Sequence, residues 1–97
     1  MSGATDIVLA LVAAERERQE VLKRSGRFKH TCADTGLTDA QKLCILTEEL
    51  GEVARAVQEA ADTAGDKHGK DLMEELVQVA AVAVAWVEGV MKAGRAE

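Results

Sequence analysis

The sequence predicts an all-α fold: a bundle of about three long helices in a single domain spanning residues 1–97, completed by homo-oligomerisation. The chain has no proline and no tyrosine, with one phenylalanine and one tryptophan. It is therefore poor in the residues that sheets favour and rich in helix formers. At 97 residues it is also a small domain, which buries only a modest share of its surface by itself, so a partner subunit would help.

The first helix is expected from about Thr5 to Arg24. Apolar residues recur there with a rough helical period, and the second half, ERERQEVLKR, is heavily charged. Gly26 follows directly and marks the helix end, since glycine is the usual residue just past a helix C-terminus. Residues 26–37 are rich in turn formers and show no period, so we expect a loop there.

The second helix is expected to open at Thr38, because Thr38 and Gln41 match the capping box that satisfies the first backbone N–H groups of a helix. Apolar residues then recur in steps of three and four, the spacing of a coiled-coil-like buried seam. This seam consists of Leu43, Leu46, Leu50, Val53, Val57 and Ala60. It fades near Ala64, and residues 65–70 indicate the short connection of an antiparallel helical hairpin.

The third helix is expected from about Asp71 to Lys92. Between Leu76 and Val87 the only polar side chain is Gln78. A helix that is apolar all round needs cover on every side, and two other helices are too few to provide it. We therefore expect a homodimer or homotetramer, two-fold dimers being the commonest assembly.

Charge and hydropathy restrict the partners. The formal net charge of −5 argues against a nucleic acid or an anionic membrane as the main partner. The apolar run at 76–87 is too short to cross a bilayer. The N-terminal apolar stretch follows Asp6 and precedes ERERQE, unlike a secretory leader. Cys32 and Cys44 have no metal-type spacing and are expected to be reduced thiols, so we expect a cytoplasmic protein.

Three glutamates, Glu48, Glu49 and Glu52, crowd one short stretch of the second helix, although like charges this close on a helix repel each other. On a helical projection, Glu48 and Glu52 fall opposite the apolar seam and Glu49 lies on its shoulder. A solvated charged face is the simplest explanation. However, Ile45 and Ala56 bracket this acidic stripe, as expected where a second surface packs nearby.

A second acidic stripe follows on the third helix, where Asp71, Glu74, Glu75 and Gln78 are spaced by three or four residues. In an antiparallel hairpin this stripe would lie near the first one, at an approximately matching height. Facing carboxylates repel strongly unless a divalent cation lies between them. Mg²⁺ prefers oxygen ligands and keeps waters that a phosphate can displace. The two stripes therefore predict a magnesium site.

The two acidic motifs, EELGE at 48–52 and EELVQ at 74–78, together resemble those of the MazG-like, all-α nucleoside triphosphate pyrophosphohydrolases. In that family an EExxE motif on one helix precedes an ExxD motif on the next. The resemblance covers most of the chain, from Glu15 onward. It implies a Mg²⁺-dependent hydrolase that converts a (deoxy)nucleoside triphosphate to the monophosphate and pyrophosphate.

The resemblance also implies roles for individual residues. Glu49, Glu52 and Glu75 match catalytic, metal-binding positions, and the full candidate ligand set is Glu48, Glu49, Glu52, Glu75 and Gln78. Gln78 stands where the family has Asp; an amide oxygen can ligate a cation but brings no charge, so we expect weaker metal binding. Two alternatives stay open: a non-catalytic helical interaction module, and a degenerate family member that binds nucleotide or metal without turnover.

Substrate contacts are expected from four residues outside the acidic stripes. Lys70, at the start of the third helix, is the best-placed phosphate contact. Arg18 and Gln19 on the first helix could meet a sugar or base, although a surface ion-pair network within ERERQE explains them equally well. Phe28 in the loop could stack on a nucleobase or plug the end of the bundle.

Overall fold

The computed structural model describes residues 3–62 and 66–94, with the side chains of 60–62 and 66–70 left out. Over these residues the chain is helical with no strand, which confirms the predicted all-α class. Three helices account for it: α1 (Gly3–Arg24), α2 (Asp39–Asp62) and α3 (Asp66–Lys92).

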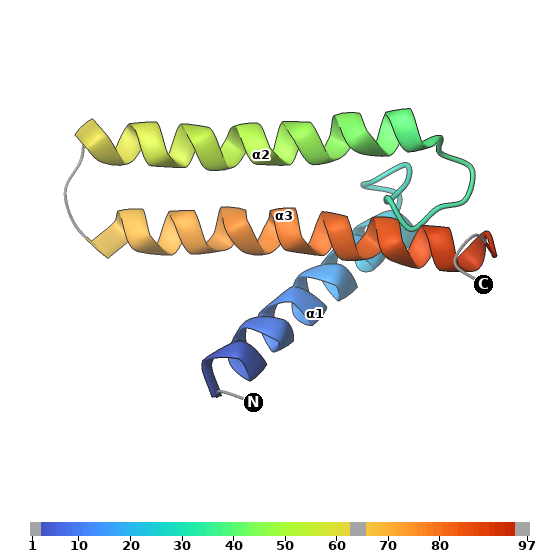
Figure 1. Ribbon diagram of the computed structural model, residues 1–97, viewed down its shortest axis with the longest axis horizontal. Helices are drawn as coiled ribbons and strands as arrows, with labels where there is room; N and C mark the ends of the chain where they lie inside the picture. The colour runs from blue at the N-terminus through green and yellow to red at the C-terminus, as the bar shows by residue number, and fades with distance from the viewer. Residues whose placement is uncertain (1–2, 63–65, 95–97) are drawn as a thin grey trace.

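The central element is α3, which packs against both other helices. Figure 1 shows α2 and α3 running antiparallel, as predicted, and α1 crossing α3 obliquely near the end where the loop 25–38 turns. The N-terminal half of α1 extends away from this hairpin, and its residues 3–11 are exposed. None of the described helices combines the length and the hydropathy that a bilayer crossing requires.

The helix boundary signals at both ends of the loop are confirmed. The N–H of Thr38 donates to Oε1 of Gln41 at 2.8 Å, and the N–H of Gln41 donates to Oγ1 of Thr38 at 3.1 Å, which is the reciprocal capping box. At the other end, α1 stops at Arg24, and Gly26 has a φ of 83°. Glycine adopts this left-handed conformation without the penalty that a Cβ imposes.

The apolar seam predicted for α2 is only partly buried. Leu46 and Val53 are half-buried, but Leu43, Leu50 and Val57 are 55, 58 and 52% exposed. The buried and half-buried side of α2 is formed instead by Lys42, Ile45, Leu46, Glu49, Glu52, Val53 and Ala56. The expectation that Glu52 lies opposite the buried face is therefore wrong, whereas Glu48 is exposed as expected. Periodicity defines the faces of a helix without saying which one meets its neighbour.

The helix α3 begins at Asp66, five residues before the predicted start near Asp71. Its first turns lack an apolar period, so the pattern carried no signal for them. The longer helix brings the acidic stripes to the same height: Glu75 lies nine residues after Asp66, and Glu52 ten residues before the end of α2 at Asp62. At about 1.5 Å per residue, these positions agree within one helical turn.

The buried core lies where the loop folds onto the hairpin. Cys32 and Ala33 of the loop, 3 and 0% exposed, cluster with Val82 and Ala85 of α3. Trp86 of α3 packs against this cluster. A short loop segment thus supplies much of the cover that α3 needs, and it thereby sets the position of the loop residues before it.

A close approach at Gly89 of α3 leads to a stability prediction. A Cβ at this position would lie 2.5 Å from Nζ of Lys42, which is 1% exposed, and 2.9 Å from the carbonyl oxygen of Cys32. We expect Gly89→Ala to destabilise the protein by about 1–3 kcal/mol, because buried backbone must shift to admit the methyl group. Chemical denaturation measures this change.

The matched control is Gly51→Ala. Gly51 is exposed on α2, and a Cβ there would meet no atom within 4 Å among the residues described. This variant should be stabilised by about 0.5–1 kcal/mol, since alanine is the better helix former. If Gly89→Ala stabilised the protein as Gly51→Ala does, the neighbours of Gly89 would be shown to accommodate the methyl group without loss of stability.

Candidate functional site

Glu49 and Glu75, one on each hairpin helix, are near enough for the charge of Glu75 to raise the pKa of Glu49. Oε2 of Glu49 on α2 and Oε2 of Glu75 on α3 are both buried, and neither has a hydrogen-bond partner within the described chain. Buried polar atoms in proteins normally find a partner, and burying an unpaired charge is costly. The pair marks a place where the described part of the chain leaves two carboxylate oxygens unsatisfied.

The charges around Glu49 act on its protonation. Burial raises the pKa of Glu49 above its ordinary value, and the neighbouring carboxylates of Glu75, Glu52, Glu15 and Glu48 raise it further, in that order. Like charges in a partly desolvated place disfavour ionisation. A cation bound beside the pair would lower the pKa of Glu49 instead.

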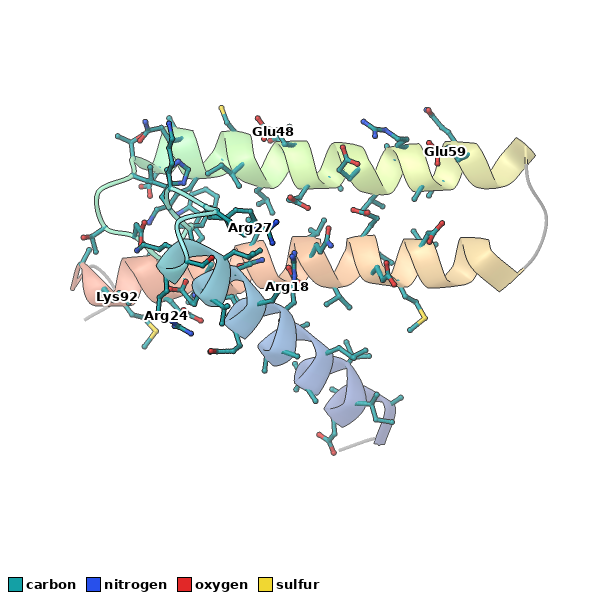
Figure 2. The ribbon with its side chains drawn as sticks, turned by 180° about the vertical axis from the view of Figure 1, so that it is seen from behind. Arg18, Arg24, Arg27, Glu48, Glu59 and Lys92 are labelled. Carbon is teal, nitrogen blue, oxygen red and sulfur yellow. The ribbon has the colours of Figure 1, made fainter. Side chains whose placement is uncertain are left out.

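The other two glutamates of α2 are placed differently from Glu49. Glu52 is half-buried and pairs with Arg55 at 3.2 Å. Glu48 is exposed, and Figure 2 shows it on the side of α2 turned away from α3. Successive residues of a helix diverge by about 100°, so when Glu49 is turned inward Glu48 does not join the pair.

The donor set decides what kind of cation site the residues fit. In the part of the chain that the structure describes, no three His, Cys, Asp or Glu side chains converge closely enough to hold a metal ion. What the fold offers is two neighbouring carboxylates with partnerless oxygens, and Glu52 and Gln78 lie one helical turn along from them. Mg²⁺ is commonly held by one or two carboxylates together with waters and substrate phosphates. The residues therefore fit a cation that arrives with its phosphates and not a closed protein cage.

A pocket of about 390 Å³ opens beside Glu49, between α1, the loop and the hairpin. Small-molecule sites usually have volumes in the range of about 300–1,000 Å³. Five of the residues predicted from the sequence line this pocket together: Arg18, Gln19, Phe28, Glu49 and Gln78. They come from all three helices and the loop, so the fold brings separately predicted positions to one place.

The other pocket residues were not singled out as a group from the sequence. Three of them, Arg27, Lys29 and His30, are basic and come from one loop segment, and the rest are Glu15, Thr31, Cys32, Ile45 and Val82. The only sequence signal was the short basic run around Phe28. A protein whose net charge is −5 thus gathers several basic side chains at one pocket, alongside two glutamates.

The side chain of Arg16 anchors α1, and with it one wall of the pocket, on α3. Arg16 donates from Nε and Nη2 to the carboxylate of Glu88 at 3.3 and 2.7 Å, and from Nη2 to Glu20 at 2.8 Å. Its Nη1 donates to Oε1 of Gln19 at 3.0 Å. Although burial lowers it, the pKa of Arg16 is raised overall, chiefly by the hydrogen bond to Glu88. Gln19 is thus held in a fixed orientation at the pocket.

The loop wall of the pocket is fastened to α1 at two points. Oγ1 of Thr31 donates to Oε2 of Glu20 at 2.9 Å, and Lys23 pairs with Asp34. Burial favours protonation of both carboxyl groups. Hydrogen bonds from Arg16 and Thr31 nevertheless lower the pKa of Glu20, and the hydrogen bond from Lys23 lowers the pKa of Asp34. Both groups stay ionised near neutral pH and hold the loop in place.

Three of the predicted substrate contacts differ in where the structure places them. Arg18 lines the pocket and also forms an ion pair with Glu15, so the alternative of a network within ERERQE is present as well. Phe28 is 39% exposed at the pocket. Lys70 belongs to α3, but its side chain lies outside the described residues.

Comparison of the chain with protein-family models, curated proteins and solved structures gives no match. The resemblance to the MazG-like enzymes therefore rests on the two acidic motifs and their helical setting.

Proposed function

We propose that this protein is a Mg²⁺-dependent hydrolase that cleaves a (deoxy)nucleoside triphosphate into the monophosphate and pyrophosphate. The observation that carries the proposal is that Glu49 and Glu75 each have a buried carboxylate oxygen that lacks a partner in the described chain, and that the charge of Glu75 acts on Glu49. A divalent cation would satisfy both oxygens. The adjacent pocket, with its basic residues, supports a phosphate-bearing ligand, and the resemblance of EELGE and EELVQ to the family motifs supports the reaction.

The acidic end of the site would handle the phosphates. Glu49 and Glu75 would supply the charged oxygen ligands, and Gln78 would add at most a neutral one. Mg²⁺, when bound, neutralises phosphate charge and lowers the pKa of a coordinated water. Glu52, half-buried one turn along α2, would accept the proton that an attacking water releases.

The loop end of the pocket would hold the nucleoside. Phe28 offers an aromatic face, and stacking of a base on such a face contributes about 1–3 kcal/mol. Ile45 and Val82 provide apolar wall on the hairpin side. Gln19 also lines the pocket. Its carbonyl oxygen accepts from Arg16 and one amide N–H donates to Glu15, so its second amide N–H is what it can offer to a sugar or base.

One observation favours a second candidate function. The pocket is lined by Gln78 where the family pattern carries an acid, so the acidic end has one formal charge fewer. A protein that binds nucleotide and cation without turnover is the alternative that follows from this difference.

Both functions are tested by incubating the protein with a panel of ribonucleoside and deoxynucleoside triphosphates, with and without Mg²⁺. Mg²⁺-dependent release of pyrophosphate and monophosphate from at least one of them supports the hydrolase. A triphosphate that raises the melting temperature in Mg²⁺ but yields no product supports the binding protein. Absence of both effects across the panel contradicts both proposals.

We also propose that the functional unit is a homodimer or homotetramer. Exposed apolar residues form a stripe on each hairpin helix, at the spacing of helix–helix contacts. The stripes consist of Leu43, Leu50 and Val57 on α2, and of Met73, Leu76, Val84, Val87 and Met91 on α3. Apolar surface of this extent on a small protein usually marks an interface, and a second copy would cover the sides of α3 that this chain leaves open.

The assembly is tested by light scattering. We expect the wild-type protein to have the mass of a dimer or tetramer, and Leu50→Glu to shift it to the monomer, because a charge would be buried in the interface. Gln58→Glu introduces the same charge at an exposed α2 position outside the stripe and should leave the mass unchanged. A monomeric wild-type protein would refute the assembly.

A further inference from the structure

Arg18 and Glu15 form a side-on ion pair at the pocket. Nε of Arg18 donates to Oε1 of Glu15 at 2.8 Å, and Nη2 donates to Oε2 at 2.8 Å. This arrangement uses two of the five N–H groups of the guanidinium. The remaining edge, formed by Nη1 and the second N–H of Nη2, makes no hydrogen bond to any described residue.

The exposure of the two side chains indicates which way the pair is turned. The side chain of Glu15 is 11% exposed, whereas that of Arg18 is 52% exposed, and both line the pocket. The carboxylate of Glu15 is therefore the more deeply buried member of the pair, and the guanidinium of Arg18 is the more accessible one. Two parallel N–H groups on one edge of a guanidinium match two oxygens of a phosphate. Arg18 can accept such a ligand without leaving Glu15.

The position of Arg18 relative to Glu49 indicates which part of a ligand it meets. The pKa of Arg18 is raised chiefly by its hydrogen bonds to Glu15 and, to a smaller extent, by the charge of Glu49. Arg18 is thus close to the acidic end of the pocket. Figure 2 shows it on the same side of the hairpin as Arg27, which also lines the pocket. Phosphates that lie beside Glu49 would lie beside Arg18 as well.

We propose that Arg18 binds a phosphate group of the ligand through its free edge, and that Glu15 is the positioning residue that holds the guanidinium in this orientation. The inference rests on the proposed function for the class of ligand, a nucleoside triphosphate with its Mg²⁺. Glu15 is itself braced, since Gln19 reaches it from Nε2 at 3.4 Å while Arg16 holds Gln19. The contacts of Arg16 that hold α1 on α3 therefore also help to hold Glu15 and, through it, Arg18.

A positioning role and a purely electrostatic role for Glu15 predict opposite effects of Glu15→Gln on phosphate binding. If Glu15 were only a negative charge near an anionic ligand, Glu15→Gln would tighten phosphate binding. As a positioning residue, Glu15 supplies two acceptors to Arg18, whereas glutamine supplies one. Glu15→Gln should therefore weaken phosphate binding, because the released arginine must be ordered again by the ligand.

The test is calorimetric binding of inorganic tripolyphosphate in Mg²⁺, a probe that has no base. We expect Arg18→Lys to raise the Kd about tenfold or more, since an ammonium lacks the two-pronged edge, and Glu15→Gln to raise it about threefold to tenfold. Combining Glu15→Gln with Arg18→Lys should bind no more weakly than Arg18→Lys alone, because Glu15 acts through Arg18. Arg18→Gln replaces the lysine variant if the latter does not fold.

The exposed pair of Glu17 and Arg24, with atoms 3.0 Å apart on the same helix, supplies the controls. Glu17→Gln and Arg24→Lys should leave the Kd unchanged. Tighter binding by Glu15→Gln, an unaltered Kd for Arg18→Lys, additive effects in the double variant, or a wild-type protein that does not bind tripolyphosphate would each overturn the inference. If the variants behave as expected and no nucleoside triphosphate is hydrolysed, the phosphate contact stands and the hydrolase function fails.

Discussion

Glu49→Gln is expected to lower Mg²⁺-dependent pyrophosphate release at least about a hundredfold, because it removes one of the two carboxylates that we propose as charged ligands of the cation. The same change should stabilise the protein by about 1 kcal/mol when no divalent cation is present. A glutamine amide can donate to the partnerless Oε2 of Glu75, which Glu49 cannot do as a carboxylate. Activity and denaturation assays on the purified variant measure both effects.

The stability difference between the wild-type protein and Glu49→Gln should also depend on pH. The folded chain raises the pKa of Glu49 above its ordinary value of 4.5, so the folded state binds this proton more tightly than the unfolded state. The stability contributed by Glu49 is present below that ordinary value and is lost as the pH rises through the raised pKa. The advantage of Glu49→Gln should therefore grow with pH in chelator, and an advantage that shrinks would contradict the buried pair.

Two further variants test whether the effect of Glu49→Gln is specific to the carboxylate pair. Glu59→Gln removes the same charge from an exposed position on α2 (Figure 2) and should leave activity unchanged. Gln78→Asp is the converse change, since it adds a carboxylate at the pocket and should tighten Mg²⁺ binding. Loss of activity in Glu59→Gln would mean that net charge, and not the pair, controls the reaction.

Arg16→Met is expected to destabilise the protein by about 2–3 kcal/mol. Removing one partner of a buried ion pair typically costs about 3–5 kcal/mol. The value here should be smaller, because the side chain of Arg16 is 9% exposed but that of Glu88 is 40% exposed. Arg24→Met, which breaks the exposed pair with Glu17, should change stability by less than about 1 kcal/mol.

The loss in Arg16→Met should be concentrated in one helix. Arg16 joins α1 to α3 through Glu88 and holds Gln19 at the pocket, whereas α2 and α3 pack against each other independently of it. Hydrogen exchange should therefore speed up in α1 and change little in the hairpin. Uniform acceleration over all three helices, or equal destabilisation by Arg24→Met, would show that Arg16 is not the anchor.

Signals that depend on neighbouring residues were recovered from the sequence. The capping box of Thr38 and Gln41 and the stop at Gly26 involve contacts over a few residues, so the pattern contains them entirely. The start of α3 was missed because its first turns are polar and lack a period. Among the predicted acidic residues, Glu49 and Glu75 have buried carboxylate oxygens, whereas Glu48 points away from α3.

The pocket lay largely beyond sequence reasoning. Glu15 and Arg27 line it, yet the sequence gives them no pattern that separates them from ordinary surface charges. The side-on pairing of Arg18 with Glu15, and the link from Arg16 to Glu88 across 72 positions of the chain, depend on how α1 crosses α3. Contacts between helices far apart in the sequence leave no periodic trace in either of them.

The sequence by itself determined that the chain is helical, where the loop between α1 and α2 lies, and that two acidic stripes occur on successive helices. Only the tertiary structure decided that Glu49 turns toward α3 while Leu43 and Leu50 turn outward, and which basic residues gather beside it. The physical reason is that helical periodicity depends on local geometry, whereas the choice of the face that is buried depends on the shape and chemistry of whatever packs against it.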